Sequence, residues 1–180
     1  MKNKILVIGG TGFIGFHLLR FLKKKNKVFS ISKNKPKKIR RLKGVNYIFC
    51  DIFKKNKLYE KLEKKNFDYV INLGGYVDHS NKLKTLQSHY YGCKNLVDFF
   101  RKRKIKLFIQ ISSSLEYGKN KSPHSETLKC KPSAIYGISK YRSSQYILKR
   151  DKQNSFPYAI LRLYQIYGPN QSINRLIPIV

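Results

Sequence analysis

The chain has 180 residues, of which 41% are hydrophobic, and a formal net charge of +30. This is the length of one globular domain with enough apolar residues for a core, and no apolar run approaches the about 20 residues of a membrane-spanning helix. Its three cysteines are widely spaced, with no CxxC pair and no histidine cluster nearby, which argues against a disulfide framework and a zinc site. We therefore expect a soluble, untargeted protein of the reducing cytoplasm, with one domain over residues 1–180 and no metal.

The positive charge raises nucleic acid or an anionic membrane surface as a partner. However, lysines occur on nearly every predicted helix and loop, together with many Asn, Ile, Phe and Tyr residues. That distribution indicates a compositional bias of the whole chain, and no nucleic-acid-binding motif accompanies it. We therefore do not expect nucleic acid or a membrane as the main partner.

A glycine-rich turn lies between a predicted strand and a predicted helix near the N-terminus. Residues 5–8 are apolar throughout, as expected of a parallel strand that is buried on both faces. Gly9 permits a tight turn, Gly12 lets backbone N–H groups approach a pyrophosphate at the positive end of the helix, and Gly15 lets the helix pack against the strand. The alternative is a turn that binds nothing, but the strand and helix on either side favour dinucleotide binding. The predicted contacts are Gly9, Thr11, Gly12, Phe13, Ile14 and Gly15.

The second predicted strand, Lys27–Ser32, ends without the acidic residue that usually binds the adenosine ribose in a dinucleotide fold. Ser32 and Lys33 stand there instead, followed by further basic residues up to position 41. Because hydroxyl and ammonium groups can bind a 2′-phosphate that an acid would repel, the cofactor is NAD or NADP with a lean to NADP. A solvated basic loop in a lysine-rich chain is the alternative.

Two further strand ends carry predicted cofactor contacts. Asp51 follows the strand Val45–Cys50 and could accept a hydrogen bond from the adenine amino group, with Ile52 beside the ring. Alternatively, Asp51 is the N-cap of a helix predicted over Lys54–Lys65. The strand Phe67–Leu73 ends in two glycines whose missing side chains would let a ring or a ribose lie against the backbone. The predicted contacts at this second end are Leu73, Gly74 and Gly75.

The rest of the chain continues the alternation of strands and helices. The predicted elements are a long helix over Asn81–Lys104, a strand over Lys106–Ile111, a polar loop over Lys119–Pro132, a helix from Ser133 and a strand over Tyr158–Tyr164. Apolar strands that alternate with helices predict a doubly wound parallel sheet of the α/β class. Residues 168–180 end in an apolar run without a predicted partner.

Tyr136 and Lys140 lie four residues apart and therefore on one face of the same predicted helix. A lysine charge beside a tyrosine favours the phenolate, which lowers the pKa of the phenol and makes it a usable acid or base. Ser113, or a neighbouring serine at the end of the fifth strand, could bind the same substrate oxygen. These groups and the glycine turn all lie at the carboxyl ends of the strands, where ligands bind in open parallel sheets.

The sequence resembles the extended short-chain dehydrogenase/reductase family, in the branch of NAD(P)-dependent nucleotide-sugar epimerases and dehydratases. The segments that carry the resemblance are Gly9–Gly15, Asp51–Ile52, Asn72–Gly75, Ser112–Gly118, Tyr136 with Lys140, and Leu161–Pro169. They occur in the family's order and span essentially the whole chain. The resemblance implies an NAD(P)-binding Rossmann fold whose C-terminal, substrate-binding part is largely missing.

The resemblance also assigns roles to residues. Ser113, four residues before Tyr117, would be the catalytic hydroxyl, and Ser114 and Gln165 would contact the substrate. Tyr136 would be the acid/base, while Lys140 would lower its pKa and hold the nicotinamide ribose. The cofactor would take a hydride from a sugar carbon, and its return to a transient keto intermediate would complete epimerisation or dehydration.

Two residues depart from the family's pattern: His89 and Gln165 each stand where relatives usually carry Asn. The implied function is an NAD(P)-dependent nucleotide-sugar epimerase or dehydratase with a nucleotide-sugar substrate, and a homodimer is compatible with it. The alternatives are a dinucleotide-binding fragment without turnover, which lacks the substrate-binding half, and a nucleotide-sugar 4-reductase.

Overall fold

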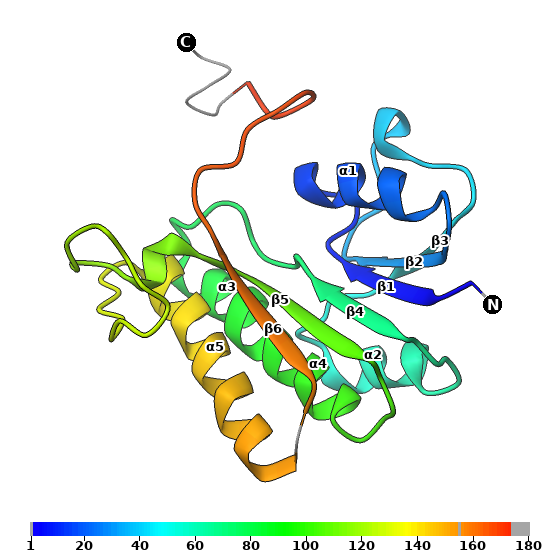
Figure 1. Cartoon of the computed structure of the whole chain (residues 1–180). Coiled ribbons are helices and arrows are strands. Elements are labelled where there is room, and N and C mark those ends of the chain that lie inside the picture. Colours follow the sequence, from blue (N-terminus) through cyan, green and yellow to red (C-terminus); the bar gives the residue numbers. More distant parts are fainter. Residues whose placement is uncertain (1, 155, 174–180) are drawn as a thin grey trace.

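The computed structural model describes residues 2–154 and 156–173 and contains a six-stranded sheet with helices on both faces (Figure 1). All pairings are parallel and the strand order is β3-β2-β1-β4-β5-β6. The strands are β1 Lys4–Ile8, β2 Lys27–Ser32, β3 Val45–Phe49, β4 Tyr69–Asn72, β5 Leu107–Ser113 and β6 Tyr158–Leu163. The predicted doubly wound α/β fold is confirmed, and the strand order reverses at β1, where a parallel sheet forms a ligand crevice.

The helices differ from the predicted ones mainly in their ends. They are α1 Phe13–Leu22, α2 Lys55–Leu62, α3 Lys82–Leu86, α4 Gly92–Phe100 and α5 Ile135–Asn154, with short helical turns η1 Lys38–Arg40, η2 Gln87–Tyr91 and η3 Ser114–Glu116. In place of the predicted long helix over 81–104 there are two α-helices, α3 and α4, joined by the π-helical turn η2, and the last of them ends at Phe100. Residues 101–104 are all basic and offer no apolar side chain to continue the buried face.

Strand β5 is longer than predicted, because Ser112 and Ser113 pair with Arg162 and Leu163 of β6. The serine side chains interrupt the apolar run, so the predicted strand ended at Ile111. The pairing holds the backbone of both serines at the carboxyl edge of the sheet.

The core lies on both sides of β1. Leu6 and Ile8 face a cluster formed with α2, α4 and α5, whereas Ile5 and Val7 face a smaller cluster with α1. All four side chains are buried. The continuous apolar run predicted for this strand therefore reflects burial on two faces.

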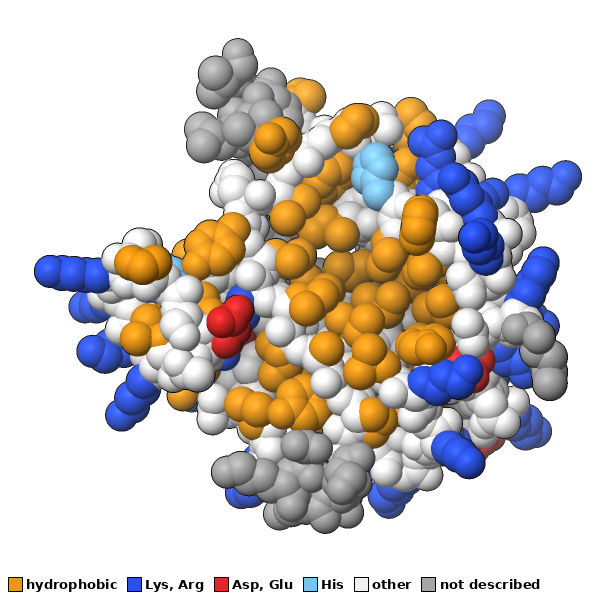
Figure 2. Space-filling view, in the orientation of Figure 1, with side chains coloured by type: hydrophobic (Ala, Val, Ile, Leu, Met, Phe, Trp, Pro, Cys, Tyr) orange, Lys and Arg blue, Asp and Glu red, His pale blue; other side chains and the backbone are white. Residues whose placement is uncertain are grey.

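Beyond α1, the same face of the sheet is open. On β5, Phe108 is buried toward α4 and α5, while Ile109 and Ile111 on the opposite face are only half-buried. Leu161 of β6 is 45% exposed. Figure 2 shows the apolar side chains gathered on this face, with lysines and arginines around the rim.

Two further predictions concern membrane-spanning helices and the C-terminal residues. None of the helices within the described residues is long and apolar enough to cross a membrane. Part of the apolar run predicted at the C-terminus, residues 174–180, lies outside the described residues.

Candidate active site

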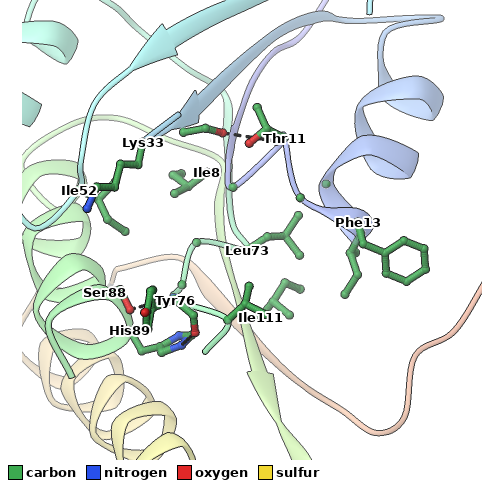
Figure 3. Close-up of a pocket in the computed structure, with 18 of the residues that line it drawn as sticks. Ile8, Thr11, Phe13, Lys33, Ile52, Leu73, Tyr76, Ser88, His89 and Ile111 are labelled. Atoms are coloured by element: carbon green, nitrogen blue, oxygen red, sulfur yellow. Dashed lines mark hydrogen bonds between the residues drawn. The ribbon is translucent and has the colours of Figure 1, made fainter. Parts of the chain in front are cut away.

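A cleft of about 1000 Å³ opens at the carboxyl ends of the strands. Its walls come from the glycine turn, from the ends of β2 to β6, and from the first turns of α5 (Figure 3). Every predicted cofactor contact lines it, as do Ser113, Tyr136 and Gln165. Ser114, by contrast, begins η3 and is not among the lining residues. The fold thus brings most of the predicted site together, while the role of each residue there stays a prediction.

The three glycines of the turn meet different physical demands. Gly9 has a φ of +79°, in the left-handed region that favours glycine. A Cβ at Gly15 would lie 2.3 Å from the carbonyl oxygen of Gly9, which is too close for any side chain. A Cβ at Gly12 would meet only that same oxygen, at 3.3 Å. Gly9 and Gly15 are therefore required by the protein itself, whereas a side chain at Gly12 would need only a small shift of the Gly9 carbonyl.

The N-terminus of α1 faces the cleft, and no acidic side chain in its first turn neutralises the positive end of the helix. Gly12 is its N-cap, no side chain caps it, and its first turn contains no acidic residue. Its free N–H groups and the positive end of the helix dipole favour an anion such as a pyrophosphate.

Ser32 and Lys33, which we predicted to bind a 2′-phosphate, each contact another residue of the protein. The Ser32 hydroxyl accepts a hydrogen bond from the Thr11 N–H at 3.4 Å. The Lys33 ammonium lies 3.2 Å from the Asp51 carboxylate, and the other oxygen of that carboxylate accepts from the Phe53 N–H at 3.1 Å. The N-cap of α2 is Lys54, without a side-chain bond, so the alternative interpretation of Asp51 as a helix cap is wrong.

Tyr136 and Lys140 share one face of α5, as predicted. The Lys140 ammonium lies 5.7 Å from the centre of the Tyr136 ring and donates a hydrogen bond to the Ile111 carbonyl of β5 at 2.9 Å. Lys140 is almost fully buried, and this burial lowers its pKa to about 8. The Ser113 hydroxyl lies at the end of β5 and accepts from the Leu115 N–H at 3.2 Å. Strand β5 and helix α5 thus supply a hydroxyl, a phenol and an ammonium to one cleft.

This arrangement agrees with the comparison of the chain with known proteins. The model of the NAD dependent epimerase/dehydratase family matches residues 5–180. The chain belongs to this family. The predicted family resemblance is therefore confirmed.

Individual relatives within the epimerase/dehydratase family differ in reaction. A dTDP-D-glucose 4,6-dehydratase of Dictyostelium discoideum is 30% identical over 98% of this chain and 46% of its own. A UDP-glucuronic acid 4-epimerase of Bacillus cereus, solved in complex with NAD, is 26% identical, with a TM-score of 0.83 over 98% of this chain and 60% of that one. A UDP-N-acetylglucosamine 4-epimerase of Methanobrevibacter ruminantium M1, in complex with UDP-N-acetylmuramic acid, is 26% identical, with a TM-score of 0.86 over 99% and 61%. The chain spans about half the length of the curated relatives it matches.

His89, which stands where the family resemblance leads us to expect Asn, packs beside the candidate acid/base. Its imidazole is buried, its Nε2 donates to the Tyr76 carbonyl at 3.1 Å, and it meets the Tyr136 ring edge-on with centroids 5.0 Å apart. A Cβ at Gly75 would lie 1.9 Å from this imidazole. The missing side chain at Gly75 therefore makes room for His89, a reason that the local sequence did not reveal.

A second histidine, which the sequence did not indicate, lies beside Tyr136. His79, from the loop after β4, stacks on the Tyr136 ring with centroids 4.1 Å apart and an interplanar angle of 16°. His79 and His89 thus contact the phenol ring on two sides. Nothing in the spacing of these three residues indicates the contact, because they come from separate segments of the chain.

Gly12→Val should abolish cofactor binding and leave the fold intact, because the valine side chain fills the space for the pyrophosphate. Gly15→Val is the matched control that should unfold the protein, since its side chain collides with the Gly9 carbonyl. We expect at least about a 100-fold loss of NAD affinity for Gly12→Val, measured by calorimetric titration, at a near-normal melting temperature. Unchanged affinity in a folded Gly12→Val variant would contradict the assignment of this turn.

His89 makes the protein sensitive to acid. Burial lowers its pKa from 6.5 to about 3. Between these pH values the unfolded chain binds a proton that the folded chain does not, so stability falls as the pH drops from 6.5 toward 3. Replacing the imidazole in His89→Gln removes this contribution. Melting temperatures across that range should fall less steeply for the variant than for the wild type, and equal slopes would refute the assignment.

Proposed function

We propose that this chain carries the cofactor-binding and proton-transfer half of a nucleotide-sugar epimerase or dehydratase. The observation that carries the proposal is the convergence of Ser113, Tyr136 and Lys140 on the cleft that the glycine turn opens. The family assignment supports it, and relatives of both reaction types match the chain. The proposed substrate is a nucleotide sugar, since the similar proteins act on sugars linked to UDP or dTDP.

The residues present fit a dinucleotide. The cleft volume, the space beside Gly12 and the uncapped N-terminus of α1 suit a pyrophosphate between two nucleosides. Bound NAD would supply the acceptor for a hydride from the sugar. Asp51 and Ile52 would hold the adenine, and Lys140 has ammonium protons beyond the one given to Ile111 with which to hold a ribose hydroxyl.

The chain's own residues would handle the proton. As the sugar C–H bond gives up its hydride, the Tyr136 phenolate takes the proton of the hydroxyl on the same carbon, which leaves a carbonyl. The Ser113 hydroxyl would bind that oxygen, and the positive charge on Lys140 would favour the phenolate. Return of the proton and the hydride after rotation of the keto sugar gives epimerisation, and loss of water before the return gives dehydration.

A binding module without turnover is the alternative function. It would need the glycine turn and the strand ends but not Tyr136, Lys140 and Ser113 at one place. The convergence of these groups therefore favours an enzyme, and no observation favours a reductase over the epimerase or dehydratase.

We propose NAD as the cofactor, against the lean of the sequence toward NADP. The solved Bacillus cereus epimerase contains NAD. In this chain the Lys33 ammonium is paired with Asp51, whose carboxylate would repel a 2′-phosphate. Because the Lys33 side chain is exposed to solvent, we expect the ion pair to change the relative affinity for NAD and NADP only slightly.

Asp51→Asn should raise the affinity for NADP relative to NAD, by up to about fivefold, because it removes the repelling charge and releases Lys33. Calorimetric titration with both nucleotides measures the ratio, and Glu60→Gln, which neutralises an exposed carboxylate of α2, is the matched control. Tighter binding of NADP than NAD by the wild-type chain would reject the proposed cofactor.

The proposed mechanism is tested by Tyr136→Phe. The variant should lose turnover by at least about 100-fold and keep its NAD affinity within about twofold, since it lacks only the hydroxyl. Lys140→Ala should lower both, because the ammonium serves the phenol and the ribose. Turnover is measured with UDP-glucose and NAD, in this chain and in a longer form that includes a substrate-binding half. Most of the activity remaining in Tyr136→Phe at neutral pH would eliminate the mechanism.

A further inference from the structure

Glu116, in the short turn η3 that follows the serines of β5, is a completely buried carboxylate. One of its oxygens accepts hydrogen bonds from the hydroxyls of Ser112 and Ser144, the latter at 2.7 Å. The other oxygen accepts from the Arg162 guanidinium at 2.9 Å. Burying an unpaired carboxylate would be strongly unfavourable, and here both oxygens have partners.

The three donors come from three different elements. Ser112 is on β5 next to Ser113, Arg162 is on β6, and Ser144 is on α5, one helical turn beyond Lys140. The Glu116 carboxylate therefore connects the strand that presents the candidate hydroxyl to the helix that presents Tyr136 and Lys140.

Arg162 fixes the far side of this cluster. Its guanidinium also contacts the Tyr117 hydroxyl at 3.4 Å and the Glu126 carbonyl at 3.3 Å, and it lies over the Tyr117 ring. Burial disfavours its charge, but the hydrogen bonds with Glu116 and Tyr117 outweigh this and raise the pKa of Arg162.

We propose that Glu116 is a positioning residue for the reaction, which holds Ser113 at a fixed distance from the Tyr136–Lys140 pair through Ser112, Ser144 and Arg162. The inference rests on the proposed function. It adds a residue that does not line the cleft and acts on the reacting groups only through its neighbours.

Glu116 also acts on Lys140 through its charge. The groups that face Lys140 are Cys93 of α4, His89 of η2, Tyr136 on its own helix and Glu116. Burial lowers the pKa of Lys140 to about 8, while Cys93 and Glu116 oppose this. The pKa of Cys93 is itself raised to about 12 by burial, so its thiol is uncharged at neutral pH. The Glu116 carboxylate, paired with Arg162, therefore opposes the effect of burial on Lys140.

A series of variants separates the effects of the position and the charge of the Glu116 carboxylate from its effect on folding. Glu116→Asp keeps the charge but shortens the side chain. Glu116→Gln removes the charge and leaves Arg162 unpaired, and Glu116→Gln combined with Arg162→Gln gives a neutral, hydrogen-bonding pair. Glu126→Gln is the matched control, because the Glu126 side chain is exposed and the residue binds Arg162 only through its backbone carbonyl. Melting temperature, NAD affinity across pH, and kcat and KM with UDP-glucose are measured for each.

In the wild type, NAD affinity should fall as the pH rises through about 8, where Lys140 loses its proton. Glu116→Gln should move this midpoint down by about 0.5 pH unit or more and lower the melting temperature. The double variant should recover much of the melting temperature but keep the lowered midpoint. Glu116→Asp should keep the wild-type midpoint and the NAD affinity at pH 7, while kcat falls about 10- to 100-fold through misplacement.

The pH midpoint does not require turnover, so the two hypotheses can fail separately. A wild-type midpoint and kcat in the double variant would show that Glu116 only supports the fold, and would overturn the inference. Full turnover in both Glu116→Asp and Glu116→Gln would do the same while leaving the proposed function intact. If no form of the wild type turns over but the midpoint shifts as expected, the proposed function fails and the link between Glu116 and Lys140 stands.

Discussion

The site depends on how closely α1 approaches β1. At Gly15 the helix backbone lies so near the Gly9 carbonyl that any side chain would collide with it, and Gly9 in turn lies against the backbone of Leu73 at the end of β4. This contact places the positive end of α1 at the point where the strand order reverses. A larger residue at Gly15 would push the helix away from the turn, and one at Gly9 would collide with the end of β4. The fold and the position of the proposed cofactor site thus share one steric constraint.

Burial controls the charges around the candidate acid/base. It drives His89 and Cys93 toward their neutral forms and brings the pKa of Lys140 down to about 8. A pKa near 8 suits the proposed role of Lys140, which is to favour the phenolate of Tyr136. Glu116, held by Arg162 and two serines, opposes the effect of burial on Lys140. The electrostatics of the site therefore extend through β5 into the interior, beyond the residues that line the cleft.

Two histidines form the aromatic surroundings of Tyr136. His89 meets the phenol ring edge-on, and His79 stacks on its face. The absence of a side chain at Gly75 is what allows the His89 imidazole to lie there, because a Cβ at position 75 would collide with it. Residues 75 and 89 are therefore coupled by packing.

Local patterns in the sequence determined the strands, the fold class, the glycine turn and the Tyr136–Lys140 spacing. Each depends on neighbours within a few residues: continuous apolar runs, glycines at fixed intervals, and one helical turn. Only the tertiary structure decided that Lys33 pairs with Asp51, that His79 and His89 pack on Tyr136, and that Glu116 binds Arg162. These partners lie 18 to 57 residues apart along the chain in the first two cases and 46 in the last, and such pairs leave no periodic signal. They form because folding brings separate strand ends to one edge of the sheet, where burial leaves each charged or polar group dependent on the partner it meets there.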